Sequence, residues 1–201
     1  MARSEEQYKM IRDQRYEEIS DAALKIFARK GFAGTKISDI TSSINLSHGL
    51  LYHYFKSKEE IYVSLITNVL DQFTRVIEEA ETMTGTPYDK LNWLTDLTFS
   101  GSAEVALNRH MLIMEALHAD FLSDEMKQTL LQQYSESLKG IARMISDGQR
   151  EGIFINGDPL ELAAYYLSLS QGLTLWNAKG IYPINVSTQS VLRPLLVNPS
   201  S

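Results

Sequence analysis

The sequence predicts an all-α protein, and three observations support this fold class. Apolar residues recur every three or four positions along most of the 201 residues, which is the spacing of one helix face. Ser, Thr and Asp residues typical of helix starts stand between these segments. No segment of useful length alternates apolar and polar residues as a half-buried strand would. We therefore expect three amino-terminal helices, a long fourth helix and a helical body.

The first helix is expected over about residues 6–30, and Gly31 stands where it should end. Arg29 and Lys30 precede that glycine, and cations are favourable near the negative end of a helix dipole. Thr35 is a good cap for a second helix of about two turns. The buried side of that helix is predicted to carry Ile37, Ile40 and Ile44.

A tight turn and a third short helix are expected next. Asn45 stands where such a turn requires a positive φ, a conformation that Asn tolerates better than any residue except Gly. Ser47 can cap the helix that follows. Leu51 and Phe55 are four residues apart, so they should share its buried side.

Helical signals continue to the end of the chain. Ser57 with Glu60 three residues later predicts a capping box that opens a long fourth helix. Further helices are expected over about residues 124–149 and 159–179, each behind a serine or aspartate cap, and a last short helix near residues 187–196.

Composition limits the classes of function. The net charge of −6 divides into +3 for residues 1–58, with ten Lys and Arg against seven Asp and Glu, and −9 for the remainder, with nine against eighteen. A mildly basic amino-terminal quarter on an acidic body suits a polyanion-binding head. The chain has no cysteine, which excludes disulfides and thiol sites and is compatible with a cytoplasmic location. We expect neither a secretory signal nor a membrane partner, because no apolar run approaches the roughly 18 residues that a span needs.

The second and third helices, with the turn at Asn45 and Leu46, predict a helix-turn-helix whose second helix enters the major groove of DNA. With Leu51 and Phe55 pointing inward, the neighbouring polar and aromatic side chains face outward, where they can bind phosphates, stack, or meet base edges. The outward residues are expected to be His48, Gly49, Tyr52, His53 and at least the edge of Tyr54. For the two tyrosines, half-buried packing under the fourth helix is the alternative.

Residues 15–66 resemble the amino-terminal domain of the TetR family of bacterial transcriptional repressors. The residues that carry the resemblance are Ala22, Ala23, Ile26, Phe27 and Gly31, then Thr35, Ile37 and Ile40, and then the nearly letter-for-letter segment Leu51 to Ile61. The sequence departs from the family pattern at Asn45, Thr41 and Leu50, where the family usually has Gly, Ala, and Thr or Ser. The motifs cover about a quarter of the chain.

The resemblance implies a ligand-released repressor that binds a near-palindromic operator in double-stranded DNA as a homodimer. It divides the chain into a helix-turn-helix DNA-binding domain, residues 1–57, and a ligand-binding and dimerisation domain, residues 58–201. The positions that match DNA-contacting positions of the family are Lys36, Ser38, His48, Gly49, Tyr52, His53, Tyr54 and Lys58, the last of them on phosphate.

Two further sets of residues are expected in the body. Small and apolar residues near the carboxyl end could pair two subunits in a four-helix interface, with ordinary intrachain core as the alternative; they are Ala164, Ser168, Gly172, Val191, Leu192 and Leu195. Aromatic residues and methionines of the middle helices could line a pocket for an apolar or amphipathic inducer, again with core as the alternative; they are Trp93, Phe99, Met111, Met114, His118, Phe121, Tyr134 and Tyr166.

An enzyme and a purely structural helical domain are the other classes of function to weigh. Glu115 and His118 form a Glu-x-x-His pair, but bundle di-iron sites need two such pairs and further glutamates. The sequence has no glycine-rich phosphate loop, and no nucleophile that would pair with His110 can be identified. We expect no catalysis, no metal and no cofactor. A purely structural domain would leave an outward-facing Tyr52 and His53 without a role.

Overall fold

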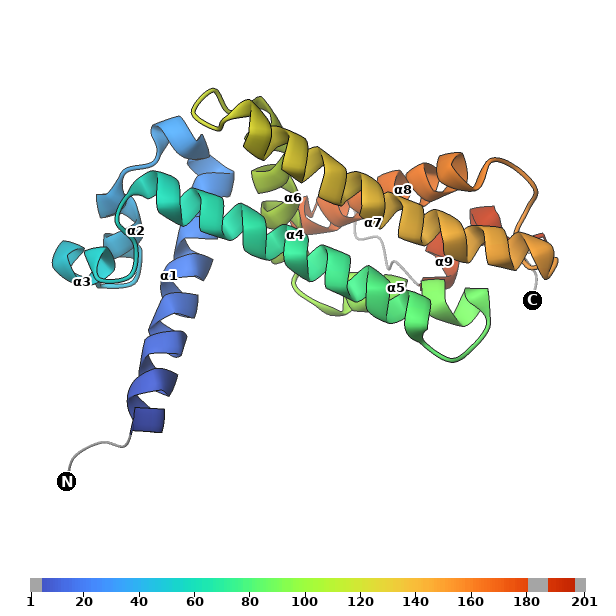
Figure 1. Ribbon diagram of the computed structural model, residues 1–201, viewed down its shortest axis with the longest axis horizontal. Helices are drawn as coiled ribbons and strands as arrows, with labels where there is room; N and C mark the ends of the chain where they lie inside the picture. Colours follow the sequence, from blue (N-terminus) through green and yellow to red (C-terminus); the bar gives the residue numbers. More distant parts are fainter. Residues whose placement is uncertain (1–4, 181–187, 198–201) are drawn as a thin grey trace.

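The computed structural model describes residues 5–180 and 188–197, and this part of the chain is helical without a strand. Figure 1 shows α1, α2 and α3 gathered at one end, with the long α4 and α7 running from there along the body. A single antiparallel bridge joins Phe154 to Leu196. The helices are α1 (Glu5–Gly34), α2 (Ile37–Ser43), α3 (His48–Tyr52), α4 (Lys58–Thr82), α5 (Pro87–Ser100), α6 (Ala103–His118), α7 (Asp124–Arg150), α8 (Pro159–Lys179) and α9 (Thr188–Leu192), followed by a 3₁₀ turn (Arg193–Leu195).

The predicted all-α fold class is confirmed, and so are most of the predicted helix starts. The side chains of Ser47, Ser57, Ser123 and Asp158 each accept a hydrogen bond from a backbone N–H in the first turn of the helix that follows. Asn45 has a φ of 51°, as the turn requires. Residue 187, where the last helix was expected to begin, lies outside the described residues.

The start of α2 differs from the prediction. Thr35 does not cap it, because the Thr35 hydroxyl donates to the carbonyl of Gly31 at 2.7 Å. Instead, Asp39 accepts from the backbone N–H of Lys36 at 2.9 Å. That bond, followed by the contact with Lys30, lowers the pKa of the Asp39 carboxyl. Thr35 therefore ties down the end of α1, while α2 is capped from within.

Two clusters of buried apolar side chains form the core, and α4 contributes to both. The first cluster joins α1, α2 and α3 to the amino-terminal part of α4 and to α6; it includes Ile19, Phe27, Leu51, Ile61 and Tyr62. The second joins the carboxyl-terminal part of α4 to α5, α7, α8 and α9 through Ile77, Leu91, Ile141, Phe154 and Leu192. The helix-turn-helix is thus packed on one end of a helix whose other end belongs to the body.

The two parts also meet at a backbone break in α1. Gly31 has φ 70° and ψ 169°, a combination reached essentially only by glycine. The break frees the N–H of Phe32, which donates to Glu115 Oε1 of α6 at 2.7 Å. The Tyr62 hydroxyl of α4 donates to the other carboxylate oxygen of Glu115 at 3.1 Å. We call this arrangement of Gly31, Phe32, Tyr62 and Glu115 the junction.

Candidate nucleic-acid interface and ligand cavity

The recognition helix α3 is anchored by two residues and leaves the rest of its surface to solvent. Leu51 is fully buried and Phe55 is 3% exposed, whereas Tyr52 is 51% exposed. His48, Gly49 and His53 are exposed as well, and a Cβ added at Gly49 would meet no atom within 4 Å. The predicted division of this helix into a buried and an outward side is confirmed.

The neighbouring residues extend this exposed surface on both sides. Lys36 and Ser38 at the start of α2 are exposed, and Tyr54 is half-buried against the first cluster. Sequence reasoning gave no DNA-contacting role to Lys56, whose exposed side chain directly follows α3 and forms no ion pair with any described residue. Its position directly after Phe55, just beyond the end of the recognition helix, could have suggested it.

Lys58 does not lie as expected. Its ammonium group donates to the carbonyls of Phe32 at 2.8 Å and Thr35 at 3.0 Å, and it stands 4.1 Å above the centre of the Phe32 ring. Lysine at a helix carboxyl end satisfies carbonyls that lack intrahelical partners. In this structure Lys58 therefore secures the end of α1 and the link to α2, instead of standing free for a phosphate.

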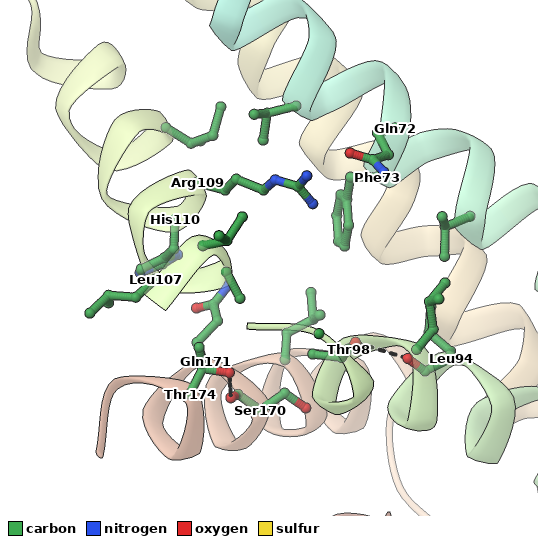
Figure 2. Close-up of a pocket in the computed structure, with 18 of the residues that line it drawn as sticks. Gln72, Phe73, Leu94, Thr98, Leu107, Arg109, His110, Ser170, Gln171 and Thr174 are labelled. Atoms are coloured by element: carbon green, nitrogen blue, oxygen red, sulfur yellow. Dashed lines mark hydrogen bonds between the residues drawn. The ribbon is translucent and has the colours of Figure 1, made fainter. Parts of the chain in front are cut away.

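A cavity of about 520 Å³ opens in the body, walled by α4, α5, α6, α7 and α8. This size is within the usual range for small-molecule sites. Figure 2 shows side chains converging on it from several helices, with Phe73 and Gln72 on α4, Leu94 and Thr98 on α5, Arg109 and His110 on α6, and Ser170, Gln171 and Thr174 on α8.

Two of the eight residues predicted to line a ligand pocket, Tyr134 and Tyr166, do so. The other six do not line it, and three of them take the alternative place in the core. Trp93 and Phe99 pack against the second cluster and Met114 against the first. Met111 and His118 are exposed. Phe121 stacks on Phe32 at a ring-centre distance of 3.6 Å.

The predicted subunit interface is also corrected in part. Val191, Leu192 and Leu195 are almost fully buried within their own chain, in the second cluster, so their side chains are not free to meet a second subunit. The residues predicted on α8 differ from these: Ser168 is exposed, Ala164 and Gly172 are partly exposed, and a Cβ at Gly172 would meet no atom within 4 Å.

Two residues named for catalysis or metal binding have ordinary structural roles. Glu115 is held in the junction, and the Nδ1 atom of His118 is 3.0 Å from the carbonyl oxygen of Met114. Within residues 5–180 and 188–197, no three His, Cys, Asp or Glu side chains are grouped as metal ligands would be. In the same part of the chain, no helix combines the length and the apolar composition of a membrane span.

The cavity is lined by α4 to α8, whereas the exposed recognition helix is α3. A DNA-binding protein that responds to a small molecule has such separate sites. The fold and the exposed α3 define a helix-turn-helix DNA-binding protein. Residues 19–65 match the family model described as "Bacterial regulatory proteins, tetR family". The segment that contains the helix-turn-helix is thus the part of the chain that matches this family.

Similarity to individual proteins extends beyond the matched segment. The chain is 28% identical over 163 residues to the uncharacterized HTH-type transcriptional regulator YfiR of Bacillus subtilis (strain 168), covering 81% of this chain and 79% of the relative. It is 27% identical over 167 residues to the fatty acid metabolism regulator protein of the same organism, covering 81% and 83%. A crystal structure of AibR in complex with isovaleryl coenzyme A and operator DNA shares the fold, with a TM-score of 0.65, 18% identity and coverage of 88% and 93%.

Proposed function

We propose that the protein is a repressor that binds a near-palindromic operator as a homodimer and releases it when a small molecule enters the cavity. The observation that carries the proposal is the geometry of α3. Leu51 and Phe55 anchor it inward, while Tyr52 and His53 are exposed. These two side chains can donate to bases or phosphates, or pack on thymine methyl groups.

The proposed DNA-contacting surface consists of α3 and the residues beside it. His48, Gly49, Tyr52 and His53 would enter the groove, and Tyr54 would contribute its exposed edge. Three exposed residues would bind phosphates: Lys36, Ser38 and Lys56. Lysine is a point charge suited to phosphate, and a serine hydroxyl can donate to a phosphate oxygen. Residues 1–57 would carry DNA recognition, and residues 58–201 would carry ligand binding and dimerisation.

The proposed subunit interface is the outward face of α8. Four large apolar side chains of this helix are exposed: Leu160 (43%), Tyr165 (56%), Leu175 (40%) and Trp176 (46%). Ala164, Ser168 and Gly172 lie on the same helix and allow close approach of a second α8. Exposed apolar surface of this kind marks an interaction site, and pairing by a two-fold axis would place two copies of α3 about 34–36 Å apart, one turn of DNA.

The cavity is proposed as the inducer site. It touches α4, which also carries the helix-turn-helix at its other end, so a ligand that favours one arrangement of the body would shift α4 and the spacing of the two recognition helices. If the ligand releases the operator, ligand and operator must weaken each other's binding by the same factor. The proposed repressor acts in the cytoplasm and catalyses no reaction.

Selection of bound sequences from a random DNA pool, followed by mobility shift on the enriched site, tests the proposal. We expect an inverted repeat. Tyr52→Ala and His53→Ala should each weaken operator binding by roughly 10-fold or more, since a good base contact is worth about 1–3 kcal/mol. Asn156→Ala, an exposed position on a body loop, is the matched control and should bind normally. Recovery of no enriched sequence, or full binding by both α3 variants, would refute the proposal.

A further inference from the structure

The hydroxyl groups that line the cavity on α5 and α8 differ in kind from the arginine that α6 contributes. On α5 and α8 the hydroxyl groups are already engaged within the protein. Thr98 donates to Leu94 O at 2.8 Å, Ser170 to Tyr166 O at 2.9 Å and Thr174 to Ser170 O at 2.9 Å. The Tyr166 hydroxyl lies 2.9 Å from the hydroxyl of Thr95. Since Thr95 gives its own hydrogen to Leu91 O at 2.7 Å, Tyr166 is the donor.

A hydroxyl group has one hydrogen and two lone pairs. With their hydrogens committed, these four hydroxyls of Thr98, Ser170, Thr174 and Tyr166 can offer only lone pairs to a molecule in the cavity. Lone pairs repel an anionic group, so these hydroxyls disfavour the anionic head of a ligand. The apolar side chains of Leu94, Leu97 and Leu167 on the same two helices can contact a hydrocarbon chain.

Arg109 on α6 is the opposite kind of group. Figure 2 shows its guanidinium extending into the cavity, toward Gln72 and Phe73 of α4. No described residue forms a hydrogen bond or an ion pair with it, and the lining contains neither Asp nor Glu. Burial lowers the pKa of the neighbouring His110 and so disfavours its charged form. Arg109 is the only Lys or Arg among the described lining residues.

A guanidinium with five N–H donors binds a carboxylate or phosphate in a two-pronged geometry. The apolar lining around it comes from all sides, with Leu70 and Phe73 on α4, Leu94 on α5, and Leu107 and Ile113 on α6. We propose that the cavity binds an amphipathic organic anion, with the anionic head on Arg109 and a hydrocarbon chain against the α5 and α8 side. This inference rests on the proposed function, in which the same cavity holds the inducer, and it specifies the charge of that ligand.

Calorimetric titration of the full-length protein tests the charge with three probes that share a ten-carbon chain: decanoate, decanol and decyltrimethylammonium. Decanoate is expected to bind roughly 10- to 100-fold more tightly than decanol, the range that a hydrogen bond to a charged group supplies. The cation should bind more weakly still. Arg109→Met should remove the preference for decanoate and leave decanol binding unchanged, and Arg109→Lys should keep part of it.

The control is Arg75→Met, which changes an exposed arginine of α4 outside the cavity lining and should leave all three affinities as they are. Thermal unfolding of each variant shows whether it is folded. A fourth probe, decanoyl coenzyme A, carries phosphates and no free carboxylate. Its affinity, compared with that of decanoate, shows which of the two anionic groups the cavity binds. Arg109-dependent binding of either anion supports the proposal and identifies the source of the anion.

Equal binding of decanol and both anions, tighter binding of the ammonium probe, or anion binding that survives Arg109→Met would overturn the proposal. Absence of binding by all four probes, in a protein that still binds its operator, would overturn it too while leaving DNA recognition intact. The protein could instead bind anions through Arg109 and yet enrich no sequence from the random DNA pool. That result would refute the proposed function but support the anion site.

Discussion

Removal of the Glu115 carboxylate is expected to destabilise the protein through the junction. Glu115→Ala takes away the acceptor of two hydrogen bonds, from the Phe32 N–H at 2.7 Å and from the Tyr62 hydroxyl at 3.1 Å. A hydrogen bond to a charged group contributes about 1.5–3 kcal/mol. Because the side chain is only partly buried, water replaces some of this, and we expect a loss of about 2–4 kcal/mol in the free energy of unfolding.

Glu115→Gln is the matched variant. The amide keeps the shape, its oxygen can accept from Phe32 and its nitrogen can donate to the Tyr62 oxygen, so the loss should stay below about 1 kcal/mol. Urea unfolding followed by circular dichroism, at one fixed protein concentration, measures both values. A Glu115→Ala variant within about 0.5 kcal/mol of the unmodified protein would contradict the role given to the junction.

Gly31 offers a second measurement on the same contact. A Cβ at this position would lie 2.8 Å from Glu115 Oε1, in addition to the strain of a φ of 70°. Gly31→Ala should therefore cost about 1–3 kcal/mol from the backbone alone and more from the contact. In a Glu115→Ala background the contact is absent and only the backbone cost remains, so the two losses should sum to more than the loss in the double variant. Strict additivity would argue against direct contact between them.

Three further outcomes are expected, all measured by urea unfolding. Gly148→Ala would place a Cβ 2.2 Å from the buried ring of Phe154, which should cost about 1–3 kcal/mol; Gly34→Ala, where the Cβ meets only ordinary contacts, should be nearly neutral. Lys58→Met should lose about 1–3 kcal/mol with its two bonds to carbonyls, whereas a lysine that served only DNA would leave the free energy of unfolding unchanged. Burial lowers the pKa of His110, so the folded state disfavours its proton and stability should fall as pH drops below about 6.5; His110→Gln should lessen this fall, and an identical pH dependence would refute it.

Features fixed by near neighbours in the chain could be predicted from the sequence. Ser47, Ser123 and Asp158 cap their helices through backbone groups two or three residues away, and the φ of Asn45 belongs to a single residue. The inward direction of Leu51 and Phe55 follows from their spacing of four. In each case the partner groups are within a few residues, and the periodicity of the helix gives the direction.

Features that depend on distant partners could not be predicted. The acceptors of Lys58 are 26 and 23 residues away, so its turn toward α1 has no local signal. An aromatic or methionine side chain fits a core as well as a cavity wall, so the sequence could not decide between these two places for Trp93 and Met114. Val191 and Leu192 are apolar whether they pack within one chain or between two. Arg109, a lone cation on a mostly apolar helix, was the overlooked sign of the cavity.

Because α4 contributes to both clusters, the segment that contacts DNA is shorter than the segment that must fold to support it. Ile61, Tyr62 and Ile66 are almost fully buried in the same cluster as Ile19 and Leu51. A fragment that stopped at residue 57 would expose this cluster to water and could not hold α3 in place. The smallest segment able to fold with its recognition helix ordered must therefore reach well into α4. A protease that cut between α3 and α4 would unfold the helix-turn-helix instead of releasing it as a stable fragment.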